Sequence, residues 1–333
     1  MSSLHNQEVR LVRRPGGTLH PDDFQTVDTE VQQPGPDQVL VKTRWLSMDP
    51  YLQERVSGDL VGPIVPLNSR MVGRGLGTVV SGALPAGTLV RGEFGWQRYA
   101  TVRAADVVSL TPASGPETWH LSLLGVGGLT AWLGLHHCLL QKTFNGQGKT
   151  LLISSAAGTV GSIAGQLALK AGLKVVGIAG GAEKCAHLSQ LGFHATIDRR
   201  GVTDWVAAIS QAAPEGIDYY FDNSGAEILE AAVQCANARA RLLLCGHSGE
   251  YEGYLGRLRS SDILYKRLCL EGFLVWDHAA EFAQAGQALA LAARNGQVQV
   301  HETIHKGLAN APAALHALLK GEGMGKHLLR VED

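Results

Sequence analysis

The first third of the chain alternates apolar and polar positions over short distances. Apolar runs occupy residues 38–48, 75–82, 88–92 and 96–102, and breakers such as "QQPGPDQ" and "GALPAGT" stand among them. Short strands separated by glycine and proline at this spacing are typical of small antiparallel structures. The pattern predicts an antiparallel barrel or sandwich up to about residue 110.

Near residue 120 the pattern changes to one of strands and helices in alternation. Residues 149–156 form an apolar β-rich run, residues 160–172 carry apolar positions at helical spacing, and residues 174–180 read as a strand again. The alternation continues through a helix at 183–192, a strand at 217–225, a helix at 226–236 and a strand at 241–247. It predicts a parallel sheet with right-handed crossovers.

The end of the chain predicts four more elements. These are an apolar strand at 268–276, a long helix at 279–295, a helix at 311–321 and a strand at 326–331. We expect the last two elements to pack back on the N-terminal part.

A small-residue loop joins the first strand of the alternating region to its helix. Ala156, Gly158 and Gly161 form AxGxxG in this strand–loop–helix context. Gly158 allows the backbone to approach a pyrophosphate, Gly161 allows the helix to lie close to the strand, and the helix N-terminus favours anions. The loop predicts a dinucleotide site, with a tight turn that binds nothing as the alternative.

The next strand indicates which dinucleotide is bound. An NAD site carries an acidic residue about 20 positions on, to bond the ribose hydroxyl, but residues 179–181 read Ala-Gly-Gly. Lys184 follows, and Arg199 and Arg200 come after the predicted third strand. Basic groups without the acid favour a 2′-phosphate and hence NADP(H), although these side chains could also be solvated surface charges.

Composition narrows the functional classes. The chain has 333 residues, 45% hydrophobic and 18% charged, and a net charge of −1, so we expect two packed domains and no nucleic-acid partner. Its five cysteines are odd in number and lack CxxC spacing, which favours a reducing compartment, the cytoplasm, over disulfides or structural zinc. No apolar run is long enough to predict a membrane span.

Several stretches together resemble one enzyme family. They include "SMDPYLQER" (47–55), "GGLTAWLGL" (127–135), "AAGTVGSIAGQ" (156–166), "CGHSGEY" (245–251) and "MGKHLLRV" (324–331). The chain resembles the zinc-independent branch of the medium-chain dehydrogenase/reductase superfamily, of the leukotriene B4 dehydrogenase, prostaglandin reductase and curcumin reductase type.

The resemblance implies an α/β fold with two domains. Residues 1–122, completed by 305–333, would form a GroES-like β-rich catalytic domain, and residues 123–304 a Rossmann doubly wound parallel-sheet domain. It also implies NADPH-dependent reduction of the C=C bond of a small α,β-unsaturated ketone or aldehyde, and a homodimer. Quinone reduction, or NADPH binding without turnover, are the alternatives.

The family's cofactor contacts fall on sixteen positions of this chain. Two positions depart from the family: Arg199 stands where tyrosine is usual, and Gly323 stands where asparagine is frequent. The implied cofactor contacts are Gly158, Thr159, Val160, Gly161, Lys184, Arg199, Asn223, Cys245, Gly246, His247, Ser248, Gly249, Tyr251, Phe273, Leu274 and Val275.

The chemistry needs a hydrogen-bond donor at the substrate carbonyl and a proton at the α-carbon. Tyr251 is the first candidate, because it follows a predicted parallel strand at its carboxyl end and matches a family tyrosine near the nicotinamide. Tyr51, after Asp49-Pro50, is the second. An ordinary loop tyrosine and a purely architectural turn are the alternatives.

A catalytic metal is not expected. Related alcohol dehydrogenases place a zinc-ligating cysteine in the segment read here as "LSMDPY", and no cysteine precedes Cys138. No other cluster of ligands along the sequence suggests a metal.

Overall fold

The computed structural model describes residues 5–17, 19–57, 62–111, 115–140, 147–252 and 256–332. They form two compact units, one of Met1–Leu121 with Glu302–Asp333 and the other of Ser122–His301. The first unit is rich in antiparallel strands, and the second alternates strands and helices, as the two sequence patterns predict.

The second unit is built on a parallel sheet of six strands in the order β11-β10-β9-β12-β13-β14. The first strand of this sheet along the sequence, β9, lies in the middle of the sheet. Successive strands are added on one side of β9 and then, from β12 on, on the other side, so the strand order reverses between β9 and β12. Ligands of open parallel sheets bind at such a reversal, beyond the carboxyl ends of the strands. The strands are β9 (Thr150–Ile153), β10 (Lys174–Ala179), β11 (Ala195–Asp198), β12 (Ile217–Asp222), β13 (Ala236–Leu244) and β14 (Cys269–Gly272).

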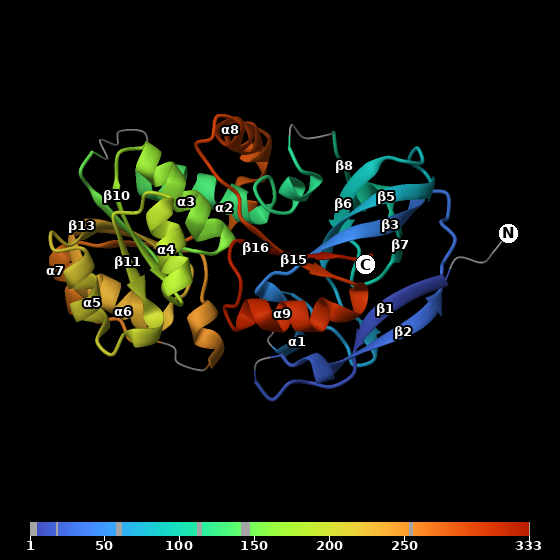
Figure 1. Ribbon diagram of the computed structural model, residues 1–333, viewed down its shortest axis with the longest axis horizontal. Coiled ribbons are helices and arrows are strands. Elements are labelled where there is room, and N and C mark those ends of the chain that lie inside the picture. The colour runs from blue at the N-terminus through green and yellow to red at the C-terminus, as the bar shows by residue number, and fades with distance from the viewer. Residues whose placement is uncertain are drawn as a thin grey trace. The chain divides into compact units, whose positions relative to one another are not determined.

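Helices cover both faces of this sheet (Figure 1). One group packs together as α2, α3 and α8, and the other as α5, α6 and α7. Fully buried Leu152, Tyr220 and Leu242 lie in the core beneath one group. The helices are α2 (Val126–Gly134), α3 (Thr159–Lys170), α4 (Ala182–Gln190), α5 (Trp205–Ala212), α6 (Ala226–Cys235), α7 (Ser260–Lys266) and α8 (Phe282–Arg294).

Two late elements differ from the sequence prediction. The strand predicted at 268–276 ends at Gly272, and the helix predicted from 279 starts at Phe282. A 3-10 segment, η7 (Val275–Glu281), stands between them and has a non-helical backbone at His278. Hydrophobicity alone could not place this break, because apolar residues continue through it.

The first unit contains two sheets whose pairings are antiparallel except for the parallel pair β15–β16. One is a three-stranded sheet, and the other is a larger sheet in which the C-terminal β16 pairs with β3, as we expected of the tail. The strands are β1 (His5–Leu11), β2 (Phe24–Glu30), β3 (Gln38–Ser47), β4 (Ser69–Arg70), β5 (Arg74–Gly82), β6 (Leu89–Glu93), β7 (Tyr99–Arg103), β8 (Val108–Ser109), β15 (Glu302–Lys306) and β16 (Lys326–Arg330), and the helices are α1 (Tyr51–Ser57) and α9 (Ala311–Leu319).

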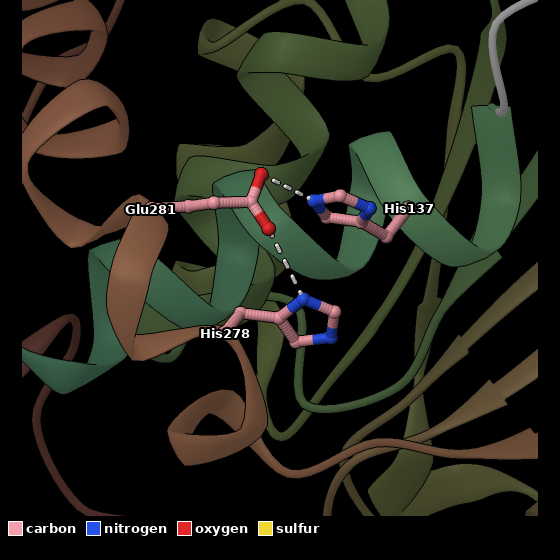
Figure 2. Close-up of side chains that lie close together, drawn as sticks. All are labelled: His137, His278 and Glu281. Atoms are coloured by element: carbon pink, nitrogen blue, oxygen red, sulfur yellow. Dashed lines mark hydrogen bonds and ion pairs between the residues drawn. The ribbon is translucent and has the colours of Figure 1, made fainter.

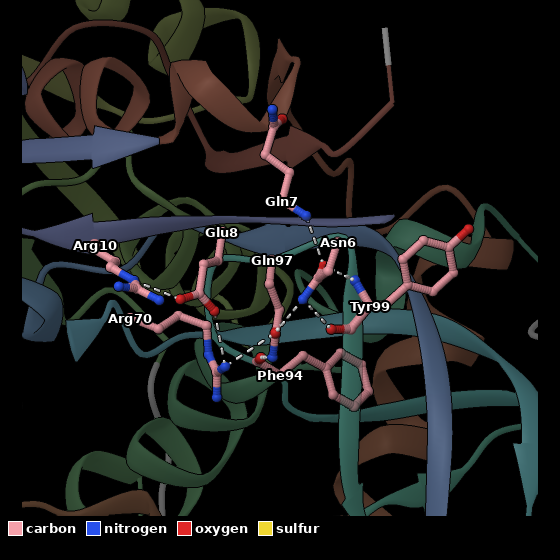
Figure 3. A network of polar contacts seen from close by, with 8 residues as sticks. All are labelled: Asn6, Gln7, Glu8, Arg10, Arg70, Phe94, Gln97 and Tyr99. Atoms are coloured by element: carbon pink, nitrogen blue, oxygen red, sulfur yellow. Dashed lines mark hydrogen bonds and ion pairs between the residues drawn. The ribbon is translucent and has the colours of Figure 1, made fainter. Parts of the chain in front are cut away.

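A buried polar network joins β1 to the segment that leads into β7 (Figure 3). The Asn6 amide donates to Gln97 Oε1 and to the Tyr99 carbonyl, each at 3.1 Å. Arg70 donates to Gln97 Oε1 at 3.1 Å and to the buried Glu8 carboxylate at 3.2 Å. Because buried polar groups are costly without partners, this network fixes how the two sheets of the unit meet.

Within the described residues, no helix is both long enough and apolar enough to cross a membrane.

Candidate functional site

The AxGxxG loop begins α3 as the motif predicts. Gly158 is the N-cap, and a Cβ at Gly161 would lie 2.7 Å from the Ala156 Cα and from the Ser155 carbonyl. Only glycine permits this approach of the helix to the turn. The first-turn N–H groups of a helix have no intrahelical acceptors, so Thr159 and Val160 begin a segment suited to a pyrophosphate.

Hydrogen bonds between the β9 and β12 loops hold the two sides of the strand-order reversal together. Ser154 Oγ donates to the buried Asp222 carboxylate at 2.9 Å and accepts from the Asn223 N–H at 2.8 Å. The Asn223 side-chain amide donates to the Ser154 carbonyl at 2.8 Å. Burial raises the pKa of Asp222 despite its donors, and the carboxylate organises this loop.

The turn after β13 closes onto the same loop. The Cys245 N–H donates to the Asp222 carbonyl at 3.0 Å, Ser248 Oγ donates to the Asn223 carbonyl at 3.1 Å, and Gly249 N–H donates to the Ser224 carbonyl at 2.8 Å. A Cβ at Gly246 would lie 2.6 Å from the Asn223 carbonyl. The structure therefore brings the expected contacts Asn223, Cys245, Gly246, His247, Ser248 and Gly249 into one loop cluster.

The backbone of Tyr251 continues this turn in a 3-10 segment, η6 (Ser248–Glu252). Its side chain lies outside the described residues, so its assignment stays a prediction.

The expected contacts at 273–275 follow the last strand. Phe273 N–H donates to the Leu244 carbonyl at 2.9 Å, which sets this segment beside the end of β13. Phe273 and Val275 are buried, and the Leu274 side chain is 67% exposed. Of the three expected contacts in this segment, Leu274 is therefore the exposed one.

The end of β10 places the arginines against the glycine turn. Parallel pairing sets Ala179 opposite Asp198, so the residues that follow each are neighbours. A Cβ at Gly180 would lie 3.0 Å from Arg199 Nε, and one at Gly181 would lie 2.9 Å from Arg200 Nη1. Two guanidinium groups thus border the turn where a ribose phosphate would stand.

An acidic side chain near this turn is engaged with the backbone. Asp198 accepts from Gly181 N–H at 2.7 Å and from Arg200 N–H at 3.0 Å, and these bonds hold the pKa of Asp198 below its usual range. Lys184 lies in the first turn of α4, half-buried, together with Glu183, as the sequence indicated. The carboxylate of Asp198 therefore ties the glycine turn to the backbone that follows β11.

In the other unit, the segment before Tyr51 is anchored by a residue from the C-terminal tail. Lys326 is 5% exposed, and its ammonium donates to Asp49 Oδ1 at 2.5 Å and to the Met48 carbonyl at 2.8 Å. Ser47 Oγ donates to the other Asp49 oxygen at 2.5 Å. Burial alone would raise the pKa of Asp49, but the Lys326 ammonium and the Ser47 hydroxyl together with Arg74 outweigh it and lower that pKa. Sequence reasoning missed Lys326, because nothing local marks its partner.

Tyr51 itself begins α1, with the Arg74 guanidinium 5.3 Å from its ring centroid. Its hydroxyl is buried and has no hydrogen-bond partner among the described residues. Burial, followed by the charges of Asp49 and Glu93, raises the pKa of Tyr51, so the hydroxyl stays protonated. A buried, unpartnered O–H is suited to donate to a ligand oxygen.

The chain matches two family models in succession. Residues 7–110 match the N-terminal domain of oxidoreductase, and residues 159–294 match zinc-binding dehydrogenase. The description of the second names zinc, but this chain has no cysteine before Cys138 that could take the place of the catalytic ligand.

Curated and solved relatives cover almost the whole chain. It is 33% identical to the NADPH-dependent curcumin reductase of Escherichia coli, over 98% of this chain and 97% of the relative, and 34% identical to prostaglandin reductase 1 of Bos taurus, over 98% and 99%. The crystal structure of CurA in complex with NADPH from Vibrio vulnificus superposes with a TM-score of 0.89 at 28% identity, over 98% and 99%. The predicted fold class, GroES-like plus Rossmann, is confirmed. The chain belongs to the medium-chain dehydrogenase/reductase superfamily, in its zinc-independent branch with the curcumin and prostaglandin reductases.

Proposed function

We propose that this chain is an NADPH-dependent oxidoreductase that reduces the C=C bond of α,β-unsaturated ketones or aldehydes. One relative is an NADPH-dependent reductase by name, and a structural neighbour at 28% identity was solved with NADPH. Family membership narrows the reaction to hydride transfer, and the residues of this chain support the choice of cofactor and substrate class.

The arginine-bordered glycine turn supports NADP(H). Arg199 and Arg200 stand beside Gly180 and Gly181, and Asp198 is occupied by backbone donors. A 2′-phosphate would find guanidinium groups there, which favours NADP(H) over NAD(H) at this turn. The close approach at Gly161, which a Cβ would fill, fits a pyrophosphate at the α3 N-terminus.

The proposed reaction rests mainly on one observation, that the Tyr51 hydroxyl is buried and has no hydrogen-bond partner among the described residues. When bound at the α3 N-terminus, NADPH would supply the hydride for the β-carbon of the substrate. Negative charge then develops on the carbonyl oxygen, and a protonated phenol can donate a hydrogen bond to it. The α-carbon takes its proton from this hydroxyl, from Tyr251 or from water.

Asp49 and Lys326 are positioning residues for Tyr51. Their ion pair fixes the turn from which Tyr51 starts α1, so the hydroxyl keeps one orientation. In this assignment Tyr51 is the first donor and Tyr251 the second. The sequence alone ranked them in the reverse order, and both assignments remain to be tested.

Turnover of matched substrates tests the proposal. The purified chain is expected to consume NADPH rapidly with a simple α,β-unsaturated ketone, and much more slowly with NADH or with the saturated ketone. Faster turnover of a quinone than of any enone would favour quinone reductase, the second candidate. NADPH binding without turnover of either class would identify a non-catalytic binding protein.

We also place the protein in a reducing compartment, the cytoplasm. Its five cysteines do not form a disulfide pattern along the sequence, and Cys185, Cys235 and Cys269 are free thiols.

A further inference from the structure

Three side chains of metal-ligand type meet in the unit formed by Ser122–His301 (Figure 2). His137 comes from the π-helical segment η4 (Leu135–Leu140), and His278 and Glu281 come from η7. One oxygen of the Glu281 carboxylate lies 2.8 Å from His137 Nε2, and the other lies 3.4 Å from His278 Nδ1. The ligating atoms of these three side chains all lie within 4.8 Å of one another. Among the histidine, cysteine and acidic side chains of the described residues, these three form such a group.

The three groups are held in place before any ion arrives. The His137 and His278 rings stack with centroids 4.6 Å apart, and His278 also stacks on Phe273 at 5.2 Å. Figure 2 shows that one nitrogen of each ring faces the carboxylate.

We propose that His137, His278 and Glu281 form a binding site for a zinc-class divalent transition metal, separate from the reaction assigned to the tyrosines. Two imidazoles and one carboxylate are ligands that zinc accepts, whereas magnesium and calcium prefer oxygen alone. Each ring binds the ion through the nitrogen that faces Glu281, so any proton on that nitrogen moves to the ring's other nitrogen or is released to solvent as the ion binds.

The site leaves part of the coordination sphere to solvent. Three protein ligands make up one fewer than tetrahedral zinc requires, and the exposed position of His137 gives water access to the fourth. The proposed site is therefore an open one, filled and emptied from solution.

The neighbouring His136 offers a matched control. Its Nδ1 lies 2.8 Å from the Trp132 carbonyl and its ring stacks on Trp132 at 3.9 Å, so its side chain is engaged one turn back along the chain. It has the same chemistry and solvent exposure as His137 but does not belong to the cluster.

Calorimetry on the metal-stripped full-length protein tests the proposal, with Zn²⁺ as titrant and Co²⁺ absorption as a second readout. Wild type is expected to bind one equivalent of Zn²⁺, and Co²⁺ is expected to give the visible bands of nitrogen and oxygen ligation. His137→Asn, His278→Asn and Glu281→Gln are each expected to weaken binding by more than about tenfold, because loss of a ligand exceeds the loss of an outer-shell partner. His136→Asn is expected to bind as wild type does.

Three results would overturn the site. They are the absence of saturable binding at one equivalent, unchanged affinity in Glu281→Gln, and a near-ultraviolet thiolate band with Co²⁺, which would assign the ion to cysteine. Circular dichroism of each variant verifies that it is folded. The substitutions are expected to leave the core intact, because His137 is exposed and Glu281 is half-buried.

Discussion

Arg199 and Lys184 are the residues on which we expect cofactor choice to depend. Arg199→Ala or Lys184→Ala removes one charge-assisted contact to a 2′-phosphate, so NADPH binding is expected to weaken by about 1–3 kcal/mol and NADH binding to stay nearly unchanged. Fluorescence titration with both cofactors measures the difference.

Lys174 provides the matched control for those variants. It stands at the opposite end of β10, where its ammonium lies 2.8 Å from the exposed Glu215 carboxylate. Lys174→Ala is expected to change binding of neither cofactor. Equal wild-type affinity for NADPH and NADH would contradict the assignment of the basic turn.

Two tyrosine hydroxyls compete for the role of donor at the substrate carbonyl. Tyr51→Phe removes only the oxygen, and loss of one such donor typically lowers turnover by about 10²–10³. We expect that loss for Tyr51→Phe at saturating NADPH, with NADPH affinity retained. A smaller loss in Tyr251→Phe, about tenfold or less, would mean that Tyr251 mainly shapes the pocket.

The opposite result for the two variants would assign the donor role to Tyr251. If Tyr51→Phe turns over an enone as fast as wild type and Tyr251→Phe is slow, the catalytic donor is Tyr251, and the buried hydroxyl of Tyr51 is architectural.

At the scale of one helix, α3 depends on a glycine. A Cβ at Gly161 would lie 2.7 Å from backbone atoms that cannot move aside, so Gly161→Ala is expected to lower the free energy of unfolding by about 1–3 kcal/mol and to weaken NADPH binding. Urea denaturation and cofactor titration measure the two effects.

Gly286 in α8 is the control, because a Cβ there would meet nothing within 4 Å. Gly286→Ala is expected to stabilise the protein by about 0.4–1 kcal/mol, through the unfolded state. If both variants lose stability equally, close packing is not the reason for Gly161.

The elements themselves were largely predictable from the sequence. The strand–loop–helix at Gly158 and the glycine turn after β10 are local patterns, and local patterns survive folding. The break at Gly272–Phe282 was not predictable, because the apolar run continues while backbone pairing ends.

Site features that join distant segments were also beyond sequence reasoning. The Asp49–Lys326 pair spans 277 positions, and the pair formed by His137 and Glu281 spans 144. Neither has a local signature, since each partner is an ordinary polar residue in its own segment. Only the tertiary structure shows that they meet.

At the scale of the whole molecule, β14 presents an open sheet edge. Within the described residues it pairs with β13 alone, and the exposed Leu274 follows it. Pairing with a second copy across a two-fold axis would satisfy that edge. Light scattering at micromolar concentration is expected to give the mass of a dimer.

A negative charge introduced beside the β14 edge tests whether that edge forms the dimer interface. Leu274→Glu is expected to shift the protein toward monomer, whereas Leu264→Glu, equally exposed at 68% but on α7, is expected to leave it a dimer. A wild-type monomer would refute the pairing.

Reduction is expected to proceed without a metal. The chain lacks the cysteine that would begin a catalytic zinc set, and a tyrosine hydroxyl is assigned the task of polarising the carbonyl. Exhaustive chelation, which would also remove zinc held at His137, should leave enone turnover unchanged and the protein folded. Turnover that disappears with the metal and returns with zinc would contradict this.

The anchoring of Asp49 by Lys326 has a consequence for how the chain is made. Domains usually fold as they leave the ribosome, N-terminal one first. Here β3 emerges early but its partner β16, with Lys326, is synthesised 277 positions later, a delay on the order of tens of seconds at ~5–20 residues per second. The middle unit, whose strands all lie in one continuous stretch, can fold meanwhile. During translation, therefore, the second unit is completed before the first.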